Sequence, residues 1–298
     1  MLEKVSSFFY LYISKSNAMT RAEYLKSLPN EEFIRFEENR HYGYKSPSGE
    51  ILIPAQYSYA PENASERMKV WVDGKCGYIN KAGEEVMPII YDDLFGYCNE
   101  ARPELVMYMA EKDGKYGLFD KDFNVLIPMI YDNMGLPHPV NPTPAQMGDK
   151  WGYINYRNEP LIDFKFDDAD SFTEDVAFVK IDGKYGYINT SGEMVIAPQF
   201  DDANTFSDGA AVVMLGDKWG HINHTGEWIV EPKYDNAENF NEGMAAVMKD
   251  DLWGFVDMTG KEVIPIIYEE VSLFYDGKAR VETDEEVFYI DKSGKIIE

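Results

Sequence analysis

The sequence predicts an all-β protein built as a tandem array of eight units of about 34 residues, each a three-stranded antiparallel meander. Three observations support this fold class: a regular period, turn residues at fixed places within it, and short β-branched runs such as "AAVVML" between the turns. An open, curved array is favoured over a closed, propeller-like ring, because eight whole units leave no split unit to join the two ends. The closed ring stands as the alternative.

The period is set by an aromatic-glycine pair or its equivalent. The steps between successive glycines are 34, 40, 35, 34, 34 and 34 residues, and another 34 lead to an eighth position at Phe288. A period this regular is typical of repeat proteins and outweighs any single motif. The pairs are Tyr42-Gly43, Cys76-Gly77, Tyr116-Gly117, Trp151-Gly152, Tyr185-Gly186, Trp219-Gly220 and Trp253-Gly254.

Turn residues recur in phase with this pair. A glycine six residues later, as in "NTSG" at 189–192, predicts a hairpin turn that ends in left-handed backbone. We therefore expect a positive φ at Gly192 and Gly226, where alanine would cost about 1–2 kcal/mol. A proline then ends the third strand, because it has no N–H for the ladder. An aromatic-acidic pair and a Phe-x-x-Gly motif mark a loop of about ten residues to the next unit.

A meander of this size has too little core to fold alone, so its apolar side chains must be buried against neighbouring units. Ahead of the array, residues 1–32 contain "TRAEYLKSL", with Thr20 as an N-cap and Pro29 as a stop. We expect this helix to cover the open face of the first unit. The run "FIRF" at 33–36 occupies the first-strand position of that unit.

Two stretches break the pattern. Residues 97–107 hold the extra length of the 40-residue step. Residues 136–144, "LPHPVNPTP", place four prolines where other units have Phe-x-x-Gly and a strand, which predicts an edge or an external loop. The stretch is either a degenerate unit or a binding loop and joint. It divides the predicted array into residues 33–135 and 145–298.

Composition limits the partners. The formal charge is −25, from 28 basic and 53 acidic side chains, and the acidic residues are spread along the chain and not gathered in a tail. Such a surface repels nucleic acids and anionic membranes and suits a basic protein or peptide. Two cysteines, Cys76 and Cys98, are too few for a disulfide framework, and Cys76 replaces an aromatic, which predicts a small buried side chain.

The N-terminus leaves two locations open. The apolar run "VSSFFYLYIS" follows Lys4, and Ser16-Asn17-Ala18 suits a cleavage site for a secreted protein. The run is short and contains serines and tyrosines, so we expect a cytoplasmic protein with export as the alternative. No stretch is long enough to span a membrane.

The motif "DKWGYIN", the turn glycine, the proline, the aromatic-Asp pair and the later Phe-x-x-Gly together resemble the bacterial WG-repeat family, named for its Trp-Gly pair. The resemblance covers residues from about 33 to 298. It implies a β-rich repeat protein of unassigned biochemical role and supplies no catalytic residues.

Candidate chemistry is sparse. The four histidines are His41, His138, His221 and His224, and His221 stands where other units have Tyr or Phe, which predicts a packing role. No catalytic triad, phosphate-binding glycine loop or zinc spacing is present in the sequence. We therefore predict no catalytic, cofactor-binding or metal-binding residues. The exception considered is calcium at three acidic pairs, for which turn formation is the favoured explanation: Asp92-Asp93, Asp167-Asp168 and Asp201-Asp202.

The sequence thus predicts a non-catalytic scaffold that binds a protein or peptide through an acidic surface. The alternative is a module that binds carbohydrate or another small ligand on its recurring aromatics, although alternation along the strands places these rings in the core more often than on a surface.

Overall fold

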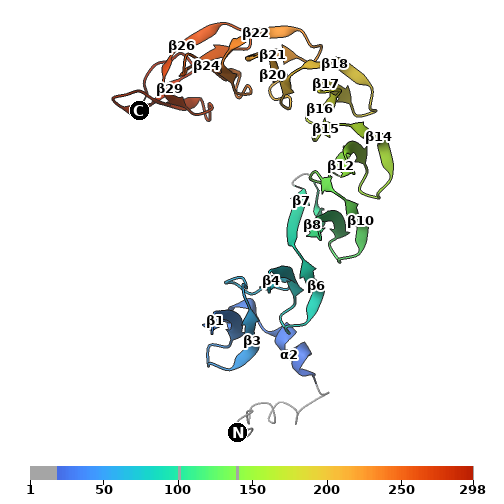
Figure 1. Cartoon of the computed structure of the whole chain (residues 1–298). Coiled ribbons are helices and arrows are strands. Elements are labelled where there is room, and N and C mark those ends of the chain that lie inside the picture. The colour runs from blue at the N-terminus through green and yellow to red at the C-terminus, as the bar shows by residue number, and fades with distance from the viewer. Residues whose placement is uncertain (1–18, 100–101, 139–140, 298) are drawn as a thin grey trace. The chain divides into compact units, whose positions relative to one another are not determined.

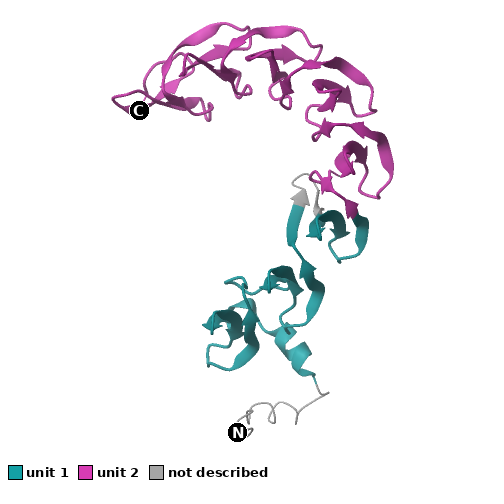
Figure 2. Cartoon of the chain, in the orientation of Figure 1, with its two compact units in different colours: residues 1–129 teal, residues 130–298 magenta. Residues whose placement is uncertain are grey.

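The computed structural model describes residues 19–99, 102–138 and 141–297 (Figure 1). It contains eight antiparallel sheets of three or four strands, in chain order, and none closes into a barrel. The chain divides into two compact units, residues 1–129 and 130–298 (Figure 2). The predicted division at residues 136–144 stays a prediction.

The first unit holds three sheets. Their strands are β1 (Ile34–Glu38), β2 (His41–Lys45) and β3 (Ile51–Tyr57); β4 (Met68–Val72), β5 (Lys75–Ile79) and β6 (Glu85–Tyr91); and β7 (Asp93–Asn99), β8 (Arg102–Lys112), β9 (Lys115–Asp120) and β10 (Val125–Tyr131), whose last residues cross the boundary.

The second unit holds five sheets, which follow one another as an open series (Figure 2). Their strands are β11 (Asn133–Met134), β12 (Thr143–Met147), β13 (Lys150–Ile154) and β14 (Pro160–Phe166); β15 (Asp168–Ala169), β16 (Val176–Ile181), β17 (Lys184–Asn189) and β18 (Met194–Phe200); β19 (Asp202–Ala203), β20 (Ala210–Leu215), β21 (Lys218–Asn223) and β22 (Trp228–Tyr234); β23 (Asn236–Ala237), β24 (Met244–Lys249), β25 (Leu252–Asp257) and β26 (Glu262–Tyr268); and β27 (Glu270–Val271), β28 (Lys278–Glu282) and β29 (Val287–Asp291).

The predicted three-stranded meander is extended by a short fourth strand. After the aromatic-acidic pair, two residues of the predicted loop pair with the next long strand, as Ala203 does with Val213. In the four sheets from β11 to β26, each period therefore begins with a two-residue strand on one edge and ends with the proline-containing strand on the other. Both positions suit residues that cannot continue a ladder.

The glycine of the aromatic-glycine pair is required by a close approach of two strands. In β17 and β18, Tyr185 is opposite Phe200 but Tyr187 is opposite Ile196, so β18 bulges where it passes Gly186. A Cβ on Gly186 would lie 2.5 Å from the carbonyl oxygen of Ile196. Only glycine leaves room for this bulge.

The turn glycine is explained by its backbone. Gly192 and Gly226 have φ of 82° and 81°, which confirms the predicted left-handed turn. In the first of these turns the Asn189 side-chain oxygen accepts hydrogen bonds from the backbone N–H groups of Ser191 and Glu193, and Gly192 N–H donates to Asn189 O. The turn is closed by its own residues.

The core lies between consecutive sheets, as predicted. One cluster combines Tyr187 of one sheet with Phe206, Ala211 and Ile222 of the next, all of them buried. The rings of Tyr187 and Phe206 meet edge to face with centres 5.0 Å apart. Stability therefore depends on contacts between neighbours and not on any single meander.

The predicted N-terminal helix is present as α2 (Arg21–Ser27), followed by a short 3₁₀ turn at Asn30–Glu32. Thr20 forms a capping box with Glu23, and Leu25 is buried in the core of the first sheets. The side chain of Lys81, only 5% exposed, donates to Leu28 O at 2.7 Å and pairs with Glu66 at 2.8 Å. The helix is thus fastened onto the second meander as well as the first.

The two irregular stretches have different outcomes. The extra residues around 97–107 lengthen the β7–β8 hairpin. Of residues 136–144, predicted to lie at an edge or in an external loop, Thr143 and Pro144 begin β12, where they are buried and pair with β13 on one side only, beyond the end of β11. Pro144 O accepts from Gly135 N–H, so the missing N–H of Pro144 faces the side where β11 has already ended. No ladder bond is lost.

Candidate functional site

The rings of the aromatic-glycine pairs are half-buried and not fully in the core. Trp151, Trp219 and Trp253 each pack against a core cluster along part of their surface. The fully buried row is two residues further along each strand. Its members in the second unit are Tyr153, Tyr187, His221 and Phe255.

The structure confirms the packing role of His221. Its ring is buried, meets Phe240 edge to face, and shares a hydrogen bond of 2.8 Å between Nε2 and Glu238 O. In the same place Tyr187 donates its hydroxyl to Asn204 O. Burial lowers the pKa of His221 to about 4, so the ring is neutral, with Nε2–H as donor and Nδ1 without a partner among the described residues.

His224 lies in a different environment. Its ring stacks on Phe206 with centres 4.1 Å apart, and Nε2 is 3.2 Å from the Glu174 carboxylate. His221 and His224 therefore contact separate partners, as expected for residues on opposite faces of a strand and its turn.

The first acid of each acidic pair joins two neighbouring periods. Asp235 accepts from Lys218 Nζ at 2.5 Å with one oxygen and from Asp250 N–H at 2.8 Å with the other. The hydrogen bond from Lys218, assisted by that backbone N–H, lowers the pKa of Asp235. The same Lys–Asp bond recurs as Lys75–Asp92, Lys150–Asp167 and Lys184–Asp201.

The second acid of the pair closes its own turn. Asp202 Oδ1 accepts from Ala203 N–H at 2.8 Å, and Asp93 and Asp168 do the same for the residue after them. These contacts account for the acidic pairs by structure alone. Within the described ranges, no group of three or more His, Cys, Asp or Glu residues is arranged to hold a metal ion.

A second row of acids lies on the tight turns that precede the long strands of the second unit. Glu174 accepts from Gly209 N–H, Asp208 from Gly243 N–H and Glu242 from Gly277 N–H. Each acid has a φ near +50°, as does Asp276 one period later. We call these four residues, Glu174, Asp208, Glu242 and Asp276, the turn carboxylate line. The sequence analysis missed it because Glu and Asp alternate within the row.

Both units carry an acidic excess, and it is larger in the second. Residues 130–298 carry 33 acidic and 13 basic side chains, a net charge of −20. Residues 1–129 carry 20 acidic and 15 basic side chains, a net charge of −5. The negative field therefore belongs mainly to the second unit.

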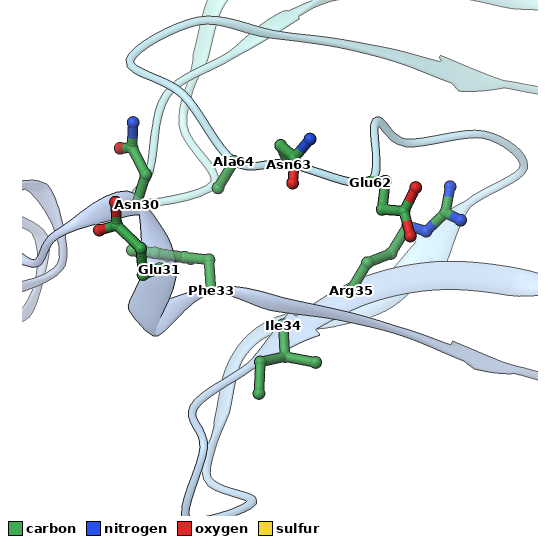
Figure 3. Close-up of a pocket in the computed structure, with 8 residues that line it drawn as sticks. All are labelled: Asn30, Glu31, Phe33, Ile34, Arg35, Glu62, Asn63 and Ala64. Carbon is green, nitrogen blue, oxygen red and sulfur yellow. The ribbon is translucent and has the colours of Figure 1, made fainter.

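A cavity of about 550 Å³ lies in the first unit, between residues 30–35 and residues 62–64. Figure 3 shows Asn30 and Glu31 at one end, Glu62 and Arg35 at the other, and Ala64 between them. The Arg35 guanidinium donates from Nη1 to Ala60 O at 2.9 Å. The side chains of Asn30, Glu31, Glu62 and Asn63 have no hydrogen-bond or ion-pair partner within the described residues.

The cavity has a local cause in the sequence. In the second unit the loop between periods supplies Phe172, Phe206, Phe240 and Phe274, each packed on the buried row. Asn63 stands at this position in the first unit, and Phe33 from the segment before β1 packs on Tyr44 in its place, with ring centres 6.3 Å apart. The loop is therefore held by the buried side chains of Ala60 and Ala64 and not by a ring, and the cavity lies beside it.

Comparison with protein families identifies the repeat. A family model described as "WG containing repeat" matches residues 42–75, 77–116, 116–137, 151–185, 185–219, 219–253 and 253–286. These ranges cover most of the chain and follow the period described above. No curated protein matches the chain.

Solved structures resemble the chain at low sequence identity. The crystal structure of a eukaryotic initiation factor has a TM-score of 0.50 at 12% identity, over 91% of this chain and 85% of that one. Hsv2p of Kluyveromyces lactis has a TM-score of 0.41 at 8% identity, over 76% and 89%. The dihydro-heme d1 dehydrogenase NirN has a TM-score of 0.42 at 12% identity, over 97% and 72%. At such identity the likeness concerns fold alone.

Among residues 19–99, 102–138 and 141–297, no helix is long and apolar enough to cross a membrane. The possible export signal within residues 1–18 lies outside the described residues.

Proposed function

The chain belongs to the WG-repeat family, and from this premise we propose that it is a non-catalytic scaffold in which residues 130–298 bind a basic protein or peptide. The observation that carries the proposal is the net charge of −20 on this unit, with acids of the turn carboxylate line repeated once per period. We propose a bacterial, cytoplasmic setting for it.

Repetition makes such a surface effective. Several similar weak contacts on one rigid support act together, because the first contact raises the local concentration of the others. A strong field of one sign also accelerates encounter with a partner of opposite charge. A flexible partner with spaced Lys and Arg residues satisfies both conditions.

Glu174, Asp208 and Glu242 of this line each already accept a backbone hydrogen bond from a glycine N–H, and their side chains reach solvent. Two of them also contact a basic side chain: Glu174 contacts His224, and Glu242 contacts Lys292 at 3.1 Å. For Asp208 the position that corresponds to His224 and Lys292 is occupied by Met258, which carries no charge. Asp208 is therefore more open to a partner's cation than Glu174 or Glu242.

The test is fluorescence anisotropy with the full chain and a labelled Lys-rich peptide, compared with a peptide of equal length in which Glu replaces Lys. We expect binding only to the basic peptide, with an affinity that falls steeply as salt rises. The triple variant Glu174→Gln, Asp208→Asn, Glu242→Gln should weaken binding by at least about tenfold. The amide oxygens keep the bonds from the glycine N–H groups.

A matched control replaces three exposed acids of the first unit, Glu37, Glu38 and Glu50, by glutamine. It removes the same charge and should change the affinity by less than about twofold. Equal losses in both triple variants would reduce the effect to net charge, and binding of the Glu peptide would contradict the proposal.

The alternative, a carbohydrate platform, draws support from the half-exposed rings of Trp151, Trp219 and Trp253. Against it, Lys180 Nζ lies 4.7 Å from the centre of the Tyr185 ring, and Arg35 lies 4.9 Å from that of Tyr42. These cations already occupy the faces a sugar would need. A glycan array with no bound sugar, together with tryptophan emission that no oligosaccharide changes, would remove this alternative.

A further inference from the structure

We propose that the cavity of the first unit binds a basic α-amino acid, one that carries a primary amine at the end of its side chain. The cavity uses no residue of the turn carboxylate line and no ring of the aromatic-glycine pairs. It is therefore a second function, separate from the scaffold function of residues 130–298.

The first argument is the state of the polar groups. Elsewhere in the repeat the recurring carboxylates are engaged by lysines or by backbone N–H groups. Around the cavity, Glu31 and Glu62 have no such partner within the described residues. The two acids and the amides of Asn30 and Asn63 are thus available to a ligand.

The second argument is the arrangement of charge. Glu31 lies at one end of the cavity, and Glu62 and Arg35 lie at the other (Figure 3). A basic amino acid has the matching pattern: its α-carboxylate faces Arg35, its α-ammonium faces Glu62 and its terminal ammonium reaches Glu31. Two carboxylates and one guanidinium give the lining a net charge of −1, and the ligand carries the opposite charge.

The third argument is the apolar middle and the size. Phe33 and Ala64 line the cavity between its polar ends, and they suit the methylene stem of such a side chain, whereas the Ile34 side chain points away from residues 62–64 (Figure 3). The volume of about 550 Å³ is within the range of small-molecule sites and leaves space for bound water.

The test is isothermal titration of the full chain with L-lysine and L-ornithine. Three analogues probe the three contacts: norleucine lacks the terminal amine, cadaverine lacks the α-carboxylate, and Nα-acetyl-lysine blocks the α-ammonium. We expect each to bind at least about tenfold more weakly than lysine, the effect of one lost charged hydrogen bond. Heat from norleucine or cadaverine equal to that from lysine would overturn the assignment, as would no heat from lysine.

Variants separate this site from a general acidic surface. Glu31→Gln and Glu62→Gln should each weaken the binding of lysine by at least about tenfold. Thermal unfolding should be unchanged, because neither side chain has a partner within the described residues. Glu38→Gln, on β1 but outside the cavity, should leave lysine affinity unchanged. Equal effects of all three variants would contradict the proposal. The scaffold proposal survives that outcome, since its test uses a different ligand and different residues.

Discussion

The two compact units follow the same repeat but use it differently. Residues 130–298 keep the step near 34 residues, fill four of their loops with a phenylalanine and carry a net charge of −20. Residues 1–129 hold a helix, a lengthened hairpin, a loop with Asn63 in place of phenylalanine, and a net charge of −5. Regularity gives a surface that repeats, whereas a single departure from it gives a cavity.

The contrast shows what the loop phenylalanine does. In the second unit it fixes the loop to the buried row, so successive loops present their acids in the same way. In the first unit Phe33 arrives from another segment, and the loop is held on the core by the small side chains of Ala60 and Ala64. Packing in the core and anchoring of the loop are separable.

The largest loss of stability should follow from replacing the glycine of the aromatic-glycine pair, which both units require. Gly186→Ala places a Cβ 2.5 Å from Ile196 O, and Gly43→Ala places one 2.5 Å from Ile53 O. Each should destabilise its own unit by at least about 3 kcal/mol, because backbone cannot move aside as a side chain can. Differential scanning calorimetry would show this loss. Gly74→Ala, with open space around it, is the control, and an equal loss there would contradict the explanation.

The next largest effect should be a loss of stability of the second unit as the pH falls. His221 titrates near pH 6.5 when unfolded and near 4 when folded, so its contribution is intact above pH 6.5 and is lost as the pH falls toward 4. The second unit should lose up to about 3 kcal/mol over this interval. Chemical unfolding at several pH values measures it. His221→Phe, which copies Phe255 one period later, should remove this dependence, and an unchanged profile would count against it.

A smaller effect should be confined to the first unit. Lys81→Met removes the donor to Leu28 O and the pair with Glu66 from a side chain that is 5% exposed. We expect a loss of about 2 kcal/mol in that unit, and faster hydrogen exchange in α2, with residues 130–298 unaffected. Lys184→Met, which breaks a pair on a more exposed lysine, should have a smaller effect. Unchanged exchange in α2 would show that Lys81 does not hold the helix.

The smallest effect should come from the turn glycine. Gly192→Ala should cost about 1–2 kcal/mol, since alanine is strained at a φ of 82°. The added Cβ would also lie 3.1 Å from Ile162, which can shift. Gly49→Ala in the first unit has an equivalent φ and open space, so it isolates the backbone strain. Thermal unfolding of the two variants separates strain from contact, and equal stability to the parent would refute the strained turn.

The sequence was sufficient for the fold because its signals were local and repeated. The turn at Asn189–Gly192 and the proline after Ile264 are specified by the residues that form them, and repetition raised each signal above chance. The buried end of the proline-rich stretch was missed for a physical reason: the side of Pro144 that lacks an N–H depends on where β11 ends, which no local rule states.

The candidate sites could be predicted less well. The half-burial of Trp219 depends on how the next meander lies across it, and the cavity depends on Phe33 replacing a ring that the loop lacks. Asn63 at a phenylalanine position was the available signal, and it becomes informative only once the other loops are aligned in space.

The doubly bonded aspartates have a consequence for how such a chain changes length. Asp201 holds a lysine behind it and the N–H of Gly216 ahead, and Asp235 does the same with Lys218 and Asp250. Deleting one full period between the two aspartates would offer Asp201 the N–H of Asp250, a donor of the same kind. Gene duplication or recombination in whole periods therefore leaves no donor or acceptor stranded. Extra residues within a period can also be accommodated, because Asp92 keeps both Lys75 and the N–H of Asp113 across the lengthened β7–β8 hairpin.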